Sequence, residues 1–181
     1  DAAALAGTLV KVGGSGGVNG FDFTKIANNG TVLPASALLG SGPTEWACTR
    51  DNVTALIWEV KTTSGLRGVN HTYTWVQTGS ADGNDGTTSG GTCATAGRCD
   101  IEKYAADVNA TALCGYADWR TPTIKELQGI VDFGRYDPAI DPTYFPNTST
   151  ATSRYWSDSQ YGIPSDSRYV RFSDGGAFAN L

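Results

Sequence analysis

The segment from Cys114 to Leu127, CGYADWRTPTIKEL, constrains the fold more than any other part of the sequence. Gly115 stands where a residue with positive φ commonly ends a helix, and Pro122 cannot extend one. Thr123 and Glu126 have the S/T-x-x-E spacing of a capping box, in which the two residues satisfy each other's free backbone amides. The segment therefore predicts the end of one helix, a turn and the start of a second helix.

Within this turn, Trp119 lies between the opposite charges of Asp118 and Arg120. We interpret Trp119 as a buried aromatic anchor and the two charged residues as an ion pair that neutralises itself locally. The alternative, in which Asp118 is a general acid and Arg120 an electrophile, has less support because the rest of the turn already has architectural roles.

The four cysteines, Cys48, Cys93, Cys99 and Cys114, form an even set that allows three disulfide pairings. We favour Cys93–Cys99, which closes a short loop, and Cys48–Cys114, which joins a strand to the end of the first helix. A metal site is a weaker interpretation, because there is no C-x-x-C pair and His71 is the only histidine. Disulfides indicate an oxidising compartment outside the cytoplasm.

Composition excludes several classes of partner. The chain has 181 residues, a net charge of −5 and a pI near 4.7, so it lacks the basic surface that nucleic acids and anionic membranes require. No apolar run approaches the roughly 20 residues that span a bilayer. The chain begins at Asp1 without a leader, so either a signal peptide has been removed or the sequence is a piece of a longer chain. We expect an extracellular or cell-surface protein after removal of a signal peptide.

Residues 1–20 differ in composition from the remainder, which we expect to form one domain over residues 21–181. Residues 1–12 are apolar on both faces of a possible strand, and residues 13–20 form a glycine-rich linker. The simpler interpretation of residues 1–20 is that they form the first strand of the domain and the loop that follows it. The alternative is a donor strand that pairs with an exposed edge on a neighbouring copy. The candidate assembly residues are Leu5, Leu9, Val10 and Val12.

The remaining patterns predict an α+β fold. A helix capped by Asp100 is expected over residues 101–112, and a second after Pro122, with Ile124, Leu127, Ile130 and Val131 on one face. The polar residues 79–91 are expected to form a surface loop. Strands are expected at residues 21–26, 55–60, 72–76, 154–156, 168–172 and 177–178, with 55–60 the strongest.

A series of motifs, in this order along the chain, resembles the C-terminal domain of the Legionella collagen-like adhesin. The motifs are CTRDNVTALIWEVK at 48–61, YTW at 73–75, the segment 114–127, DPTYFP at 141–146, YWS at 155–157 and VRFSDG at 170–175. The resemblance covers roughly residues 44–181. The residues that we take as its signature are Trp58, Asp118, Trp119, Arg120, Pro122, Thr123 and Glu126.

The resemblance implies a C-type-lectin-like fold, which formylglycine-generating enzymes share: two central helices packed on short, twisted, mostly antiparallel strands, with long loops. It also implies a secreted or surface-borne module that serves attachment. Two departures of this chain from the family's pattern bear on its function. The chain is acidic, which disfavours binding of sulfated glycans through a basic surface, and it stops at Leu181 before the family's final V-R-x-V-R strand. We therefore expect an open sheet edge.

Two ligand sites are conceivable from the sequence. Oxygen ligands for Ca²⁺ are concentrated at Asp82, Asn84 and Asp85, but the loop fails the EF-hand spacing, so a solvated loop without cofactor is the favoured interpretation. An aromatic platform for glycans is the second site, although core packing explains its residues equally well. The platform residues are Tyr155, Trp156, Tyr161 and Tyr169.

Together these patterns indicate a non-catalytic, extracellular bacterial surface module in adhesion. The N-terminal segment adds the hypothesis of a self-assembling fibre or pilus subunit, so the expected partners are copies of itself and extracellular glycans. His71 is expected on a solvated loop, which leaves little for catalysis. The alternatives are a formylglycine-generating-enzyme-like enzyme, which needs free cysteines for copper, and a calcium-dependent glycan-binding lectin.

Overall fold

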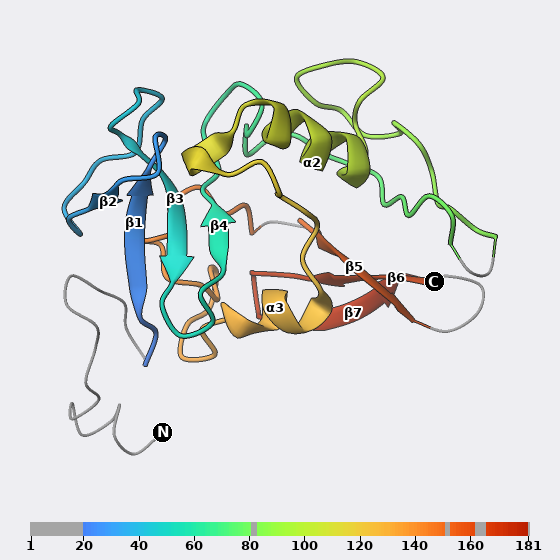
Figure 1. Ribbon diagram of the computed structural model, residues 1–181. Coiled ribbons are helices and arrows are strands. Elements are labelled where there is room, and N and C mark those ends of the chain that lie inside the picture. The colour runs from blue at the N-terminus through green and yellow to red at the C-terminus, as the bar shows by residue number, and fades with distance from the viewer. Residues whose placement is uncertain (1–19, 81–82, 151–152, 162–165, 181) are drawn as a thin grey trace.

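The structure is a computed structural model that describes residues 20–80, 83–150, 153–161 and 166–180 (Figure 1). The candidate assembly residues Leu5, Leu9, Val10 and Val12, and the calcium candidate Asp82, lie outside the described residues. No helix in the described part of the chain is long and apolar enough to cross a membrane.

Two antiparallel sheets form the framework. The first has four strands in the order β2 (Val32–Leu33), β1 (Phe23–Ala27), β3 (Trp46–Asp51) and β4 (Ile57–Glu59). The second has three strands in the order β5 (Tyr155–Tyr161), β6 (Asp166–Val170) and β7 (Ala177–Asn180). The helices are α2 (Ile101–Ala110), the short 3₁₀ turn η1 (Leu113–Gly115) and α3 (Ile124–Gly129). The predicted α+β class is confirmed.

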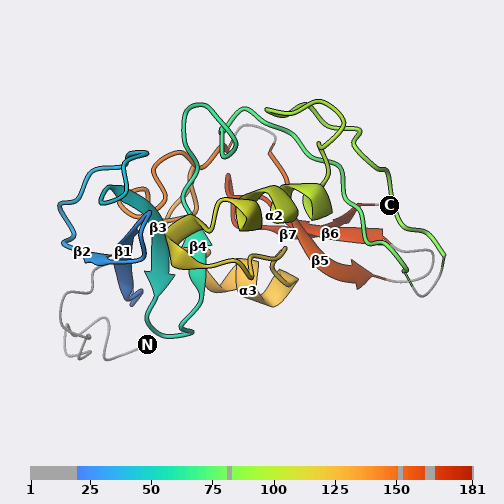
Figure 2. The same cartoon turned by 45° about the horizontal axis from the view of Figure 1, so that its top comes forward.

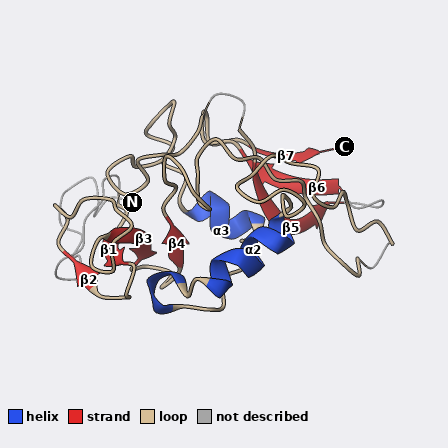
Figure 3. Ribbon diagram, turned by 90° about the horizontal axis from the view of Figure 1, so that it is seen from above, coloured by secondary structure: helices blue, strands red, loops and turns tan. Residues whose placement is uncertain are grey.

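The two sheets lie at opposite ends of the molecule, and α2 and α3 lie between them (Figure 3). The long connection from β4 to α2 runs from the first sheet to the second and returns, as Figure 2 shows in green. Indole hydrogen bonds attach it to the second sheet: the Nε1 of Trp75 donates to the carbonyl oxygen of Ser157 at 2.9 Å, and that of Trp156 donates to the carbonyl oxygen of Tyr73 at 2.8 Å.

Both helix starts follow the predicted capping chemistry. The side chain of Asp100 accepts from the amide of Lys103 at the start of α2, and Thr123 and Glu126 form the complete capping box of α3. The predicted end of the first helix was wrong: α2 stops at Ala110 rather than at residue 112. Its continuation is prevented because Ala112 has φ of 48°, in the left-handed region.

Several strand predictions were also wrong: β5 runs on to Tyr161 and β6 begins earlier, at Asp166, and the predictions at 55–60 and 72–76 fail in other ways. The longest strand of the first sheet is β3, and β4 begins only at Ile57 because Ala55 has a positive φ of 63°. Residues 72–76 form isolated bridges instead of a strand, because their partners belong to loops rather than to one neighbouring strand. These bridges join Thr72 to Thr92, Thr74 to Asp100 and Val76 to Gly86.

The buried side chains form two clusters. The first contains residues of β1, α3 and β6, among them Phe23, Leu127 and Val170. The second joins β1 and β3 to α2 and η1, and at its centre the fully buried Cys48 and Cys114 form a disulfide. The second disulfide, Cys93–Cys99, closes the loop before α2. Both favoured cysteine pairings are therefore present.

Candidate functional site

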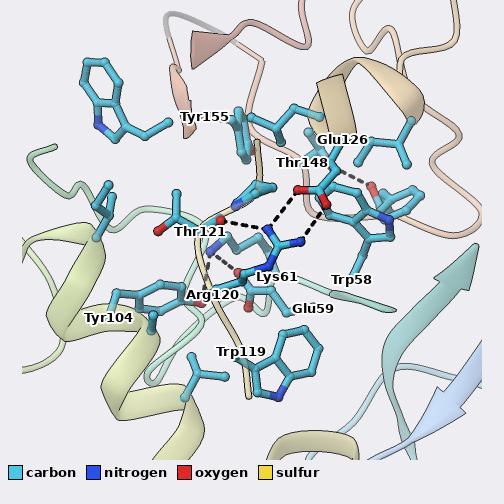
Figure 4. Close-up of a pocket in the computed structure, with 18 of the residues that line it drawn as sticks. Trp58, Glu59, Lys61, Tyr104, Trp119, Arg120, Thr121, Glu126, Thr148 and Tyr155 are labelled. Carbon is cyan, nitrogen blue, oxygen red and sulfur yellow. Dashed lines mark hydrogen bonds and ion pairs between the residues drawn. The ribbon is translucent and has the colours of Figure 1, made fainter. Parts of the chain in front are cut away.

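A cleft of about 580 Å³ opens between the two buried clusters. Val108 of α2, from the second cluster, and Leu127 of α3, from the first, both line it. Residues of β4, the turn from Tyr116 to Pro122, residues 140–149 and the start of β5 also line it. Aromatic and aliphatic side chains with a few convergent polar groups are typical of ligand or partner sites. Figure 4 shows this lining.

Strand β4 runs along the cleft. Among the residues that the structure describes, it pairs with β3 on one side and is the last strand in the sheet order, so it forms the edge of its sheet. The five consecutive residues Ala55–Glu59 all line the cleft, although side chains alternate between the faces of a strand. Ile57 packs against the second buried cluster and Trp58 against the first. The cleft therefore follows the edge of β4 and reaches both of its faces.

A polar cluster occupies the α2 side of the cleft. Lys61 forms an ion pair with Glu59, and its Nζ donates to the hydroxyl of Tyr104 at 3.1 Å (Figure 4). Burial raises the pKa of Tyr104 well above its usual value, and the negative charge of Glu59 raises it further. Tyr73 packs on Tyr104 with ring centroids 4.6 Å apart, and burial raises the pKa of Tyr73 to about 12. Both phenols are therefore neutral at physiological pH and do not suit a general base.

Two polar atoms in this region lack partners. Among the described residues, the indole Nε1 of Trp58 and the Oε2 of Glu59 are buried without a hydrogen bond. Buried polar atoms are nearly always paired, because an unmade bond costs about 1–3 kcal/mol. A donor for Glu59 and an acceptor for Trp58 are therefore what an occupant of the cleft has to supply.

The predicted ion pair between Asp118 and Arg120 is absent, and Arg120 instead contacts Glu126. Nη1 of Arg120 lies 2.9 Å from Oε2 of Glu126, and Nη2 lies 2.6 Å from Oε1 (Figure 4). Asp118 is exposed. The Arg120 guanidinium lowers the pKa of Glu126 to about 2, so this carboxylate is charged at neutral pH and does not suit a general acid.

Trp119 is only partly buried, so the prediction of a buried anchor holds in part. Its side chain packs against the second cluster, and its Nε1 donates to the carbonyl of Leu113 at 3.1 Å. The side chain of Asn109 holds its backbone: Oδ1 accepts from the Trp119 amide at 2.6 Å, and Nδ2 donates to the Trp119 carbonyl at 2.9 Å. These contacts fix the turn against α2.

The structure divides the predicted glycan platform. Tyr155 faces the first buried cluster, with its ring 5.0 Å from that of Phe172, whereas Trp156 contacts Tyr169 at 5.5 Å on the other face. Tyr169 in turn stacks on Phe178 at 5.6 Å. The side chain of Tyr161 lies outside the described residues.

The residues Trp156, Tyr169 and Phe178 therefore form a row across β5, β6 and β7, which we call the aromatic face. The guanidinium of Arg154 lies 4.9 Å from the ring centre of Tyr169, and that of Arg171 lies 4.5 Å from that of Phe178. The sequence analysis missed Phe178, which is 36% exposed and lies directly across from Tyr169 in the sheet register.

The described calcium candidates have structural roles. Asp85 Oδ1 accepts from the amides of Gly79 and Ser80, both at 3.0 Å, and Asn84 Oδ1 accepts from the amide of Gly86. Within residues 20–80, 83–150, 153–161 and 166–180, no group of three or more His, Cys, Asp or Glu side chains is placed to hold a metal ion. His71 lines the cleft and is half-buried rather than fully solvated, with its ring edge-on to that of Tyr73.

Sequence reasoning also missed the polar residues of the cleft, Glu59, Lys61 and Tyr104. One signal was present, because Glu59 and Lys61 are two places apart at the end of β4, and residues at this spacing share a face of an extended chain. The contribution of Tyr104 depends on how α2 packs, which the local pattern does not contain.

Comparison with known proteins gives one match. The family model described as the Lcl C-terminal domain matches residues 47–180, a range that includes β4, the turn from Tyr116 to Pro122 and the whole of the second sheet. No curated protein and no solved structure matches the chain.

Proposed function

The chain belongs to the Lcl C-terminal domain family, and from this premise we propose that it is a non-catalytic, extracellular module of a bacterial surface that acts in attachment. The family match is the observation that carries the proposal, since it covers the cleft and the aromatic face together. The two disulfides support a location outside the cytoplasm, where such bonds persist.

We also propose that the fold is C-type-lectin-like. Short antiparallel sheets at either end of the molecule, two helices between them and long loops support this assignment. An experimental structure compared with C-type-lectin-like domains tests it, and a different connectivity of the sheets would refute it.

The chemistry of the cleft supports a non-catalytic role. Glu126 is held as a carboxylate by Arg120, and Tyr104 as a neutral phenol by burial. The four cysteines are joined in two disulfides, so no thiol is left to bind copper as in formylglycine-generating enzymes. Stoichiometric copper together with alkylatable thiols in the purified protein would contradict this proposal.

We assign attachment to the aromatic face, because aromatic rings flanked by arginines offer both stacking and hydrogen bonding to sugars. The test is binding of the full chain to glycan arrays and to extracellular-matrix surfaces. We expect binding that falls at least about fivefold in Phe178→Ala, because loss of a stacking ring costs about 1 kcal/mol. Val32→Ala, an exposed apolar residue on the other sheet, is the matched control. Absence of any ligand would refute the attachment role.

The N-terminal segment supports a second part of the proposal, namely that copies assemble into a fibre by donating residues 2–12 to the next copy. An apolar segment followed by a glycine-rich linker is the sequence feature behind it. Head-to-tail donation does not close on itself and so builds filaments. Light scattering and electron microscopy of the full chain and of a chain without residues 1–12 test this: we expect filaments and monomers, respectively. Filaments from the truncated chain would refute donation.

A further inference from the structure

We propose that the cleft beside β4 is the acceptor groove of this assembly, and that residues 2–12 of a second copy pair there with the free edge of β4 as an added strand. This inference rests on the proposed fibre function and deepens it by naming the groove and its contacts. The alternatives, a small ligand in the cleft or the chain's own N-terminus, are outcomes of the test below.

The shape of the cleft favours an extended chain over a compact ligand. Residues Ala55–Glu59 all line it, and Ile57 and Trp58 pack on different buried clusters. An occupant that contacts both faces of β4 has to run along the edge of the strand. A polypeptide in β conformation does so, because its backbone pairs with the edge while its side chains alternate between the faces.

The composition of the proposed occupant matches this environment. A strand buried on both faces has apolar side chains at consecutive positions rather than at alternate ones. Residues 2–12, AAALAGTLVKV, follow this pattern, and Lys11 is their only charged residue. The glycine-rich residues 13–20 extend at most about 27 Å, at roughly 3.4 Å per residue, which lets the segment reach a neighbouring molecule.

The unpaired atoms of the cleft match the polar groups of the segment. Glu59 uses Oε1 for Lys61, and its buried Oε2 has no partner among the described residues. The ammonium of Lys11 supplies the missing donor. Trp58 Nε1, the second unpaired atom, donates to a backbone carbonyl of the added strand. An entering strand therefore satisfies both atoms with groups that it already carries.

Cysteine cross-linking in the full chain tests the placement. Val10→Cys is combined with Ile57→Cys on β4, and oxidised filaments are run on a non-reducing gel. We expect a ladder of covalent multimers. The matched control combines Val10→Cys with Val32→Cys, which lies on β2 at the opposite edge of the same sheet and is 60% exposed. A ladder only from the control, or only an intramolecular bond in the monomer, would overturn the inference.

A charge reversal gives a second measurement that does not depend on cross-linking. Lys11→Glu places a carboxylate against Glu59, so we expect the critical concentration for assembly to rise about tenfold or more. Lys125→Glu makes the same charge change at an exposed position on α3 and is expected to assemble normally. Normal assembly of Lys11→Glu would contradict the pairing with Glu59.

The two proposals fail in different ways. If the chain without residues 1–12 still forms filaments, donation itself is refuted. If that chain is monomeric, but Val10 does not cross-link to Ile57 and Lys11→Glu assembles normally, donation stands and the groove lies elsewhere. Displacement of the segment by a glycan bound in the cleft, measured as disassembly of filaments, would assign the cleft to the small ligand instead.

Discussion

Arg120 and Glu126 form a two-point ion pair that joins the turn after η1 to the first turn of α3. The same carboxylate accepts from the amide of Thr123, so one side chain both caps the helix and fixes the arginine that lines the cleft. The position of Arg120 in the cleft therefore depends on the cap of α3.

This pair makes stability depend on pH. The pKa of Glu126 is lowered from 4.5 to about 2 in the folded chain, mainly by Arg120. The stabilisation is therefore fully present above about pH 4.5 and is lost as the pH falls towards 2. We expect Glu126→Gln to lower the free energy of unfolding by about 1 kcal/mol at pH 7, since Arg120 is largely exposed and solvent screens the pair.

Urea denaturation from pH 7 to pH 2 measures this effect, and the difference between Glu126→Gln and the unchanged chain is expected to vanish near pH 2. Glutamine keeps the capping-box hydrogen bond, so the substitution isolates the charge. Asp118→Asn, an exposed carboxylate in the same turn, is the control. A larger fall in the free energy of unfolding for Asp118→Asn than for Glu126→Gln would contradict this assignment and support the Asp118–Arg120 ion pair expected from the sequence.

The two disulfides are expected to contribute unequally. Cys48–Cys114 spans 66 residues and Cys93–Cys99 spans 6, and the entropy of the unfolded chain that a cross-link removes grows with loop length. We expect the free energy of unfolding to fall by about 4 kcal/mol in Cys48→Ala/Cys114→Ala and by about 2 kcal/mol in Cys93→Ala/Cys99→Ala. Guanidinium denaturation of the two double variants measures both values, and equal losses would contradict the loop-length argument.

Asn109 is expected to be structural, although it begins an N-x-S/T sequon. Its amide binds both backbone groups of Trp119, so Asn109→Ala leaves a donor and an acceptor without partners and is expected to destabilise the chain by about 1–3 kcal/mol. Asn70→Ala, at an exposed sequon, is expected to change stability by less than about 0.5 kcal/mol. Thermal unfolding of both variants measures the difference. A glycan on Asn109 of the folded protein, detected by intact mass, would contradict its structural role.

Features that depend on a few neighbouring residues were predicted well from the sequence. The caps at Asp100 and Thr123 were correct because their partners lie within three positions. The partner of Arg120 was predicted wrongly, because the first turn of α3 brings Glu126 close to it across Pro122. The sequence prediction paired Arg120 with its near neighbour Asp118. In the structure, the geometry of α3 brings the more distant Glu126 into contact with Arg120 instead.

The candidate site was harder to predict, for a physical reason. The cleft is lined by residues of β4, α2, α3, β5 and the segments between them, so its lining is determined by the packing of elements that are far apart in the sequence. The placement of Tyr155 and Trp156 on opposite faces of β5 could have been predicted from the sequence. The two residues are adjacent, and a strand directs adjacent side chains to opposite faces. Phe178 joins Trp156 only through the register of two strand pairs.

The long loop offers a matched pair of glycines that separates backbone strain from steric conflict. Gly79 and Gly86 have nearly equal φ values of 78° and 82°, so alanine costs about 1 kcal/mol at either position for adopting the left-handed region. A Cβ on Gly79 meets nothing within 4 Å, whereas one on Gly86 lies 2.4 Å from the carbonyl oxygen of Trp75. Gly86→Ala is therefore expected to lose about 2 kcal/mol more than Gly79→Ala, because that oxygen belongs to the backbone and moves only with the loop. Urea denaturation of the two variants measures this difference, and equal losses would show that the approach of residue 86 to Trp75 does not hold the loop in place.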